Sequence, residues 1–151
     1  QTMRNQRFIA THRGGSLHKE QHFELIRWAH ICVEHVLPLC PEPIDPRLSH
    51  ALHIALEWTQ GTASVGDARN ASLAAIAVAR ESSHPVVIAL ARAVGHAVAT
   101  AHMADHTLRA AEYALKVVKN AGQSLEAERK WQDAQLAIGI AELVLSSRAN
   151  S

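Results

Sequence analysis

One stretch of the sequence, residues 86–119, most constrains what this chain can fold into. Up to Ala104 it is almost wholly apolar, and alanine is its commonest residue. Such a run favours a helix whose small side chains let neighbouring helices approach closely. In helical projection Arg92, His96 and Thr100 fall at i, i+4 and i+8, so they form one narrow polar stripe. The pattern predicts a helix in the middle of a bundle, whose few polar groups find partners inside the fold or line a cavity.

The composition favours the same fold class and excludes several functions. Of the 151 residues 48% are hydrophobic but only 4% are aromatic, so the core must be built from Ala, Leu, Val and Ile, which favours helices over a β-sandwich. Fifteen basic and fourteen acidic residues give a net charge of +1 without a Lys/Arg run, so a nucleic-acid partner is not expected. Arg92, His96 and His102 interrupt the most apolar stretch, which argues against a membrane span. Two cysteines are too few for a disulfide framework and indicate free thiols in a reducing cytoplasm.

Start and stop signals divide the chain into an irregular N-terminal arm over residues 1–15 and a single helical domain over residues 16–151. In the arm, Phe8 and Ile9 are expected to tuck against the bundle. Residues 45–81 and 84–120 share the same order of helix start, helix and turn at an offset of 39, which predicts two helical hairpins in tandem. We expect an all-α, compact bundle of about six helices built from such hairpins. The predicted helices cover residues 17–39, 46–60, 65–81, 85–104, 107–120 and a last helix capped by Ser124; whether residues 86–120 form one helix or two is left open.

The strongest candidate for chemistry is the segment GHAVATAHMADH, which contains His96, His102, Asp105 and His106. His102 and His106 lie roughly 40° apart around a helix with Asp105 on an adjacent bearing, so these three could meet one divalent metal. His96 points roughly 120° away from His102. The alternative is structural: Asp105 or Thr107 caps a helix, and the histidines belong to a buried polar network. With Arg92 and Thr100, these residues form a candidate ligand-binding or buried polar cluster.

No recognised catalytic signature accompanies this cluster. The HExxH metal motif, the nucleophile elbow and the glycine-rich phosphate loop are all absent, so no catalytic residue and no cofactor are assigned and a non-catalytic role is favoured. Trp28, Trp58 and Trp131 lie on three different predicted helices. Each is either a core residue or an anchor at a protein interface.

Several blocks of the sequence resemble one known family. They are RFIATHRGGSL, a helix ending in HVLPL, the DPR that opens the next helix, GHAVATAHMADHTLRAAEYALK and AERKWQ. Together they are similar to the immunity-five-like family of immunity proteins from bacterial polymorphic toxin systems, over roughly Arg7 to Leu145. The resemblance implies a small all-helical protein whose partner is a cognate toxin that it neutralises. It supplies no catalytic residues to carry over.

Three functional hypotheses follow. The first, from the resemblance, is a cytoplasmic protein that binds and occludes a toxin. The second is a metal- or small-ligand-binding bundle, enzymatic or not, that uses the His/Asp cluster. The third is a helical scaffold that acts through self-association, for example as a homodimer.

Overall fold

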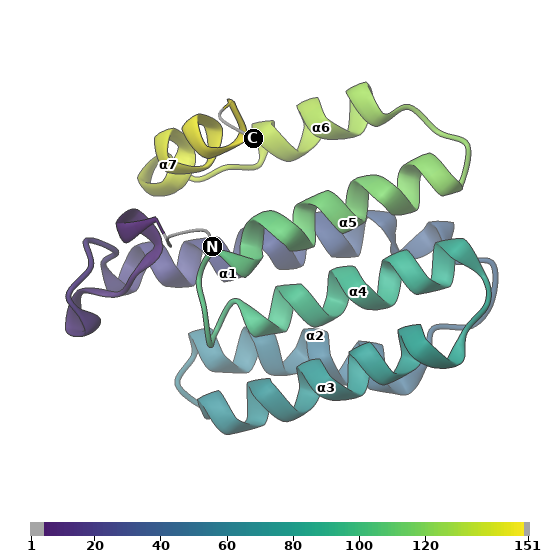
Figure 1. The fold of residues 1–151 in the computed structure, drawn as a ribbon, viewed down its shortest axis with the longest axis horizontal. Helices are drawn as coiled ribbons and strands as arrows, with labels where there is room; N and C mark the ends of the chain where they lie inside the picture. The colour runs from purple at the N-terminus through teal and green to yellow at the C-terminus, as the bar shows by residue number, and fades with distance from the viewer. Residues whose placement is uncertain (1–4, 150–151) are drawn as a thin grey trace.

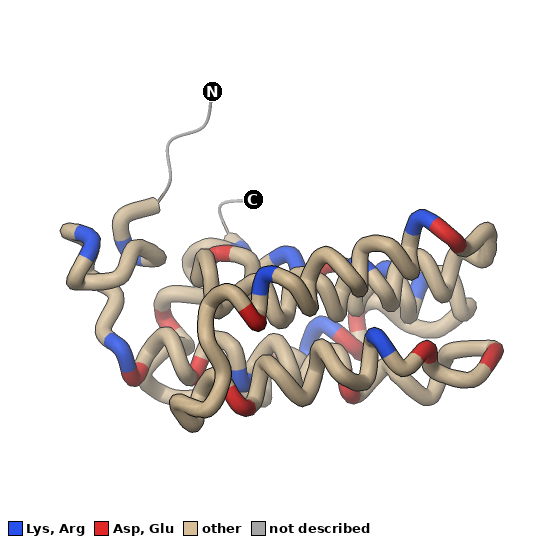
Figure 2. The backbone as a smooth tube through the Cα atoms, turned by 90° about the horizontal axis from the view of Figure 1, so that it is seen from below, with Lys and Arg blue, Asp and Glu red and all other residues tan. Residues whose placement is uncertain are grey.

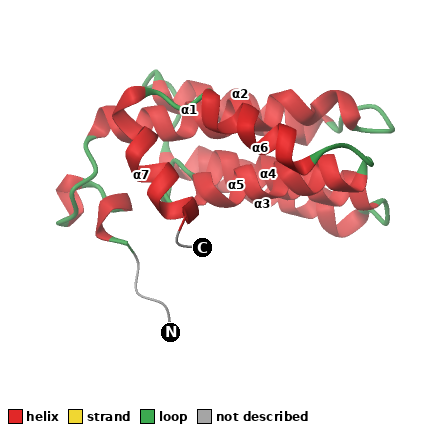
Figure 3. Cartoon of the chain, turned by 90° about the horizontal axis from the view of Figure 1, so that it is seen from above, coloured by secondary structure: helices red, strands yellow, loops and turns green. Residues whose placement is uncertain are grey.

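The computed structural model describes residues 5–149 and contains seven α-helices within that range, with no β-strand (Figures 1 and 3). The predicted all-α bundle is therefore confirmed. Two layers pack face to face: α1 and α2 form one, and α3, α4 and α5 form the other, while α6 lies along α5 and α7 along α1. The helices are α1 Lys19–Val36, α2 Pro46–Thr59, α3 Val65–Glu81, α4 Pro85–Ala99, α5 His106–Asn120, α6 Leu125–Ala134 and α7 Ile138–Ala149.

Helix α4 is the central element, as its sequence predicts. It packs against α1, α2, α3 and α5, and ten of its fifteen residues are buried. Gly95 lies where α4 packs on α3, and a Cβ there would lie 3.5 Å from Cγ1 of Ile76, which is an ordinary contact distance. The buried Ser72 hydroxyl donates to the Gly95 carbonyl at 3.0 Å and so satisfies its own polar group at this crossing.

The predicted helix starts are mostly confirmed, because the side chains that signal them form cap hydrogen bonds. The Asp45 carboxylate accepts from the Arg47 amide at 2.9 Å, ahead of Pro46 at the first helical position. Ser64 and Asp67 form the expected reciprocal capping box at the start of α3. The two hairpins α2–α3 and α4–α5 follow from these signals. The first helix begins at Lys19, two residues later than the expected start at residue 17.

Residues 86–120 form two helices, which settles a question that the sequence left open. Helix α4 ends at Ala99, and α5 begins after Asp105. The expected capping is only partly present: Asp105 holds the N-cap position but its side chain forms no cap hydrogen bond. The buried Thr107 hydroxyl donates instead to the Leu25 carbonyl of α1 at 2.8 Å, and this bond ties the start of α5 to the other layer.

The single last helix that we expected is divided into α6 and α7. A single helix would place the apolar residues Ile138 and Leu145 on one inward face, but Ile138 is 97% exposed and Leu145 is 44% exposed. The break turns a different face of the chain inward, so Ile140 and Val144 enter the core instead. The turn between Ala134 and Ile138 interrupts the apolar period of the sequence.

The N-terminal arm packs on the bundle through Phe8, which is 3% exposed. It forms two short 3₁₀ helices, Gln6–Phe8 and Thr11–Arg13, and residues 1–4 of the expected arm lie outside the described residues. Gly14 has a φ of 88°, and a Cβ on Gly15 would overlap the Ile9 carbonyl, so this turn requires both glycines. Arg7 forms an ion pair with Glu142 of α7.

Charged residues of both signs are interspersed along the bundle (Figure 2). Among the helices of residues 5–149, none is both long enough and apolar enough to cross a membrane.

Candidate functional site

The histidines of the candidate cluster come together in part, next to the turn between α4 and α5. Nδ1 of His96 lies 2.8 Å from Nδ1 of His106, so one ring donates a hydrogen bond and the other accepts it. The His96 ring also stacks on Tyr113, with centroids 5.3 Å apart and planes 7° apart. Nζ of Lys116 lies 4.4 Å from the centre of the Tyr113 ring. His106 and Tyr113 of α5, with His96 of α4 between them, thus form a row of rings that ends in the Lys116 cation.

The electrostatic environment of this row is positive. Burial, the neighbouring His106 ring and the Arg109 and Arg92 guanidiniums lower the pKa of His96 to about 4. His96 is therefore neutral near pH 7, which lets it share a proton with His106. Arg92, Arg109 and Lys116 are exposed, and within residues 5–149 none of these three cations belongs to an ion pair.

The predicted polar stripe on α4 is divided between surface and core. Arg92 lies at the surface, His96 is half-buried, and Thr100 is fully buried. The Thr100 hydroxyl donates to the His96 carbonyl at 3.0 Å. The Thr100 carbonyl accepts a hydrogen bond from Nε2 of His22 on α1 at 2.6 Å, and burial lowers the pKa of that imidazole. Thr100 thus serves to join the two layers.

The other members of the cluster lie apart from the paired histidines in their contacts. Nη2 of Arg69, on α3, donates to Nδ1 of His102 at 3.3 Å. Asp105 is half-buried at the start of α5. Within residues 5–149 no group of three or more His, Cys, Asp or Glu side chains is arranged to hold a metal ion. The metal hypothesis for His102, Asp105 and His106 thus gains no support from the geometry.

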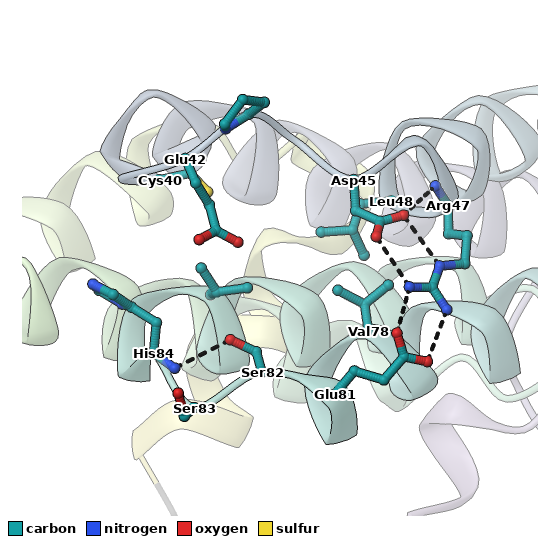
Figure 4. Close-up of a pocket in the computed structure, with 12 residues that line it drawn as sticks. Cys40, Glu42, Asp45, Arg47, Leu48, Val78, Glu81, Ser82, Ser83 and His84 are labelled. Atoms are coloured by element: carbon teal, nitrogen blue, oxygen red, sulfur yellow. Dashed lines mark hydrogen bonds and ion pairs between the residues drawn. The ribbon is translucent and has the colours of Figure 1, made fainter.

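A cleft of about 500 Å³ lies at the opposite end of the α3–α4 pair (Figure 4), and sequence reasoning missed it. The α1–α2 connector, the start of α2, the end of α3 and the start of α4 line it. Arg47 spans its wall, donating to the Asp45 carboxylate at 3.0 Å and to the Glu81 carboxylate at 2.8 Å. The hydrogen bonds from Arg47 lower the pKa of both carboxyl groups, so both remain ionised. These charges are used to fasten α2 to α3.

The tryptophans take different positions. Trp28 is 1% exposed, so it lies inside the core and is no interface anchor in this fold. Trp58 is half-buried against His22, with ring centroids 4.7 Å apart. Trp131 is half-buried and stacks on His35, with centroids 3.5 Å apart and planes 10° apart. Trp58 and Trp131 remain the two interface candidates of the original three.

A buried polar network that sequence reasoning also missed attaches α6 and α7 to the bundle. The Arg148 guanidinium donates to Asp133 and to Gln132, at 2.6 Å in each case, and lies 5.0 Å from the Trp28 ring. Gln132 is fully buried, and its side-chain amide donates to the Ala111 carbonyl at 3.1 Å. The backbone carbonyl of Gln132 accepts a hydrogen bond from Nε1 of Trp28 at 2.8 Å. No local spacing signals a network that joins residues so far apart in the chain.

Comparison with known proteins places this arrangement in context. A family model described as Imm-5 like putative immunity protein matches residues 15–138. The matched region begins at the end of the arm and includes helices α1 to α6. No curated protein and no solved structure matches the chain.

Proposed function

Because the chain belongs to the family of Imm-5 like putative immunity proteins, we propose that it binds and neutralises a cognate bacterial toxin, and that it does so as a binding protein without catalysis. The observation that carries the proposal is the extent of the family match, which covers six of the seven helices of the described chain. The proposed place of action is the cytoplasm, whose reducing conditions keep cysteines such as Cys32 and Cys40 as free thiols.

The chemistry of the described residues supports a binding role over an enzymatic one. Cys32 is buried, and its burial raises the pKa of the thiol, so the thiolate needed for nucleophilic attack is disfavoured. The carboxylates of Asp45 and Glu81 are engaged by Arg47. His96 and His106 are hydrogen-bonded to each other. The carboxylates, through their bonds to Arg47, and the histidines, through their bond to each other, thus stabilise the fold, as expected of a rigid binding protein.

The size of the molecule limits the geometry of neutralisation. A stable protein interface buries about 800 Å² on each partner, which is roughly a tenth of the 8005 Å² accessible surface. One face of the bundle therefore suffices. A toxin bound there is inhibited when the bundle covers its active site or blocks the approach of its substrate.

Co-expression with the toxin domain encoded beside the gene of this chain tests the proposal. Cells that produce both proteins should grow, whereas cells that produce the toxin with an unrelated helical bundle should not. Purified chain should inhibit the toxin stoichiometrically and form a complex that survives gel filtration. Full toxin activity should return when the two proteins are separated in denaturant and the toxin is refolded. The absence of both rescue and a complex would refute the proposal. Inhibition at substoichiometric amounts would show catalysis instead.

A further inference from the structure

We propose that the toxin contacts the outer face of α4 and α5, and that it contributes an acidic segment there. This inference rests on the proposed function and names the surface that performs it. The basic α4–α5 face consists of Arg92 and His96 on α4 and Arg109, Tyr113 and Lys116 on α5.

Direct contacts join His96, Tyr113 and Lys116, and Arg92 and Arg109 lie near His96. His96 stacks on Tyr113 with ring centroids 5.3 Å apart, and Lys116 lies 4.4 Å from the Tyr113 ring. Arg92 and Arg109 lie close enough to His96 for both to lower the pKa of its imidazole. The patch therefore has a half-buried aromatic centre and an exposed cationic rim, which is the arrangement of protein-binding surfaces.

The charges of this face are not balanced within the described part of the chain. Arg7, Arg47 and Arg148 each form an ion pair with a carboxylate. No ion pair within residues 5–149 joins an acidic side chain to Arg92, Arg109 or Lys116. Like charges gathered without a counter-charge repel one another and do nothing for the fold, but they attract a partner of opposite charge and hasten its association.

Two acidic side chains lie near this face in the sequence. Glu112 lies between Arg109 and Lys116 on α5, and both Glu112 and Lys116 border the groove between α5 and α6. Asp105 holds the N-cap position of α5, four residues before Arg109. No ion pair within residues 5–149 joins Glu112 to a cation of this face, so an acidic segment of the toxin can supply the counter-charge.

The same features favour an acidic protein segment over a nucleic acid. Three cations form a compact patch, whereas nucleic-acid sites track a longer backbone and typically neutralise about six to ten phosphates. The ring of Tyr113 is already contacted by His96 and by Lys116, so it is a poor platform for stacking bases. Guanidinium groups bind carboxylates through paired hydrogen bonds, and a partner Asp or Glu could meet Arg92 and Arg109 in this way.

A matched pair of triple variants tests the inference. Arg92→Glu, Arg109→Glu and Lys116→Glu together reverse the charge of the face. Arg13→Glu, Lys19→Glu and Arg27→Glu make the same change of net charge on the arm and α1, where these three cations are also exposed and form no ion pair within the described residues.

The probe is the catalytically inactivated toxin domain encoded beside the gene, with affinity measured by calorimetry and folding checked by thermal melts. Reversal on the α4–α5 face should weaken binding by about 100-fold or more, while the control should change it by less than about threefold. Wild-type affinity should also fall as NaCl rises from about 50 to about 500 mM, because screening weakens attraction between exposed charges. Both variants should melt close to the wild-type temperature.

The possible results separate the two proposals. If wild-type protein binds the toxin and the α4–α5 variant binds as tightly, the face assigned here is wrong while the toxin-binding function stands. If correctly folded wild-type protein does not bind, the proposed function fails, and this inference fails with it. Tight binding of a 20-nucleotide single-stranded RNA by the wild type but not by the α4–α5 variant would replace the acidic protein segment with a nucleic acid.

Discussion

Removal of the Arg148 guanidinium should detach the C-terminal helices from the bundle at a measurable energetic cost. The Arg148 side chain is 5% exposed, and among the described residues it contacts Gln132, Asp133 and the ring of Trp28. Arg148→Met keeps the apolar part of the side chain and removes only the charged group. The substitution therefore isolates the polar contacts from the packing around them.

The expected cost can be worked out contact by contact. The charge-assisted hydrogen bond from Arg148 to Oε1 of the buried Gln132 contributes about 1.5–3 kcal/mol. In the variant this oxygen loses its guanidinium donor. The Asp133 side chain is 33% exposed, so water can replace its ion pair, which contributes only about 0.5–1 kcal/mol. The cation–π contact with Trp28 adds about 0.5–2 kcal/mol. Because the variant no longer has to desolvate a guanidinium, we expect a net loss near the lower end of the sum, about 3 kcal/mol.

Urea unfolding monitored by circular dichroism and by tryptophan fluorescence measures this loss. About 3 kcal/mol corresponds to a melting temperature roughly 6–12 °C lower for a chain of this size. Arg27→Met is the control, since Arg27 is an exposed arginine near the Phe23 ring, and it should change the free energy of unfolding by less than about 0.5–1 kcal/mol. A loss below about 1 kcal/mol for Arg148→Met would refute the reasoning, because the buried network would then contribute no more than a surface contact.

Three further results are expected. Gly95→Ala should be neutral or stabilising by up to about 1 kcal/mol, because its Cβ would meet only ordinary contacts and alanine favours the helix. Gly95→Leu should destabilise the protein, because the larger side chain would meet α3. Urea unfolding measures both variants, and similar stabilities would contradict the packing of α3 on Gly95. The pKa values of His22 and His96 are lowered from 6.5 by folding, so the unfolded chain binds more protons between pH 6.5 and about pH 4, and the free energy of unfolding should fall across that window as the pH falls. A flat pH profile from pH 7 to 4 would show that neither imidazole is buried neutral. Arg92→Gln should raise the pKa of His96 in an NMR titration, and an unchanged value would place Arg92 too far away to act on it.

Local signals in the sequence were sufficient for most of the fold. Asp45 before Pro46 and the Ser64–Asp67 pair predicted helix starts that the structure confirms, because the same side chains form the cap bonds. The alanine-rich run predicted a central helix for the same reason that α4 is central, namely that small side chains permit close packing on several sides. The last helix was predicted wrongly as a single element, since apolar spacing alone does not show a turn when both segments on either side of it are helical.

The candidate site was less predictable, because it depends on contacts between helices. The spacing of His102 and His106 suggested a shared metal, yet the ring of His106 pairs with His96 across the turn, and His102 accepts from Arg69 on α3. Helical projection assumes one continuous helix, and the break before α5 removes that assumption. The Arg47 clamp likewise joins two helices that are close only after folding.

The way α4 is enclosed also bears on how such a protein could change its target. Most of this helix is buried among four others, but its exposed stripe carries Arg92 and reaches the surface beside α5. A replacement at Arg92 would change what the surface presents without moving the alanine contacts beneath it. Recognition and framework can therefore diverge at different rates, so that a new binding preference could arise by exchange of a few outer side chains while the buried scaffold stays as it is.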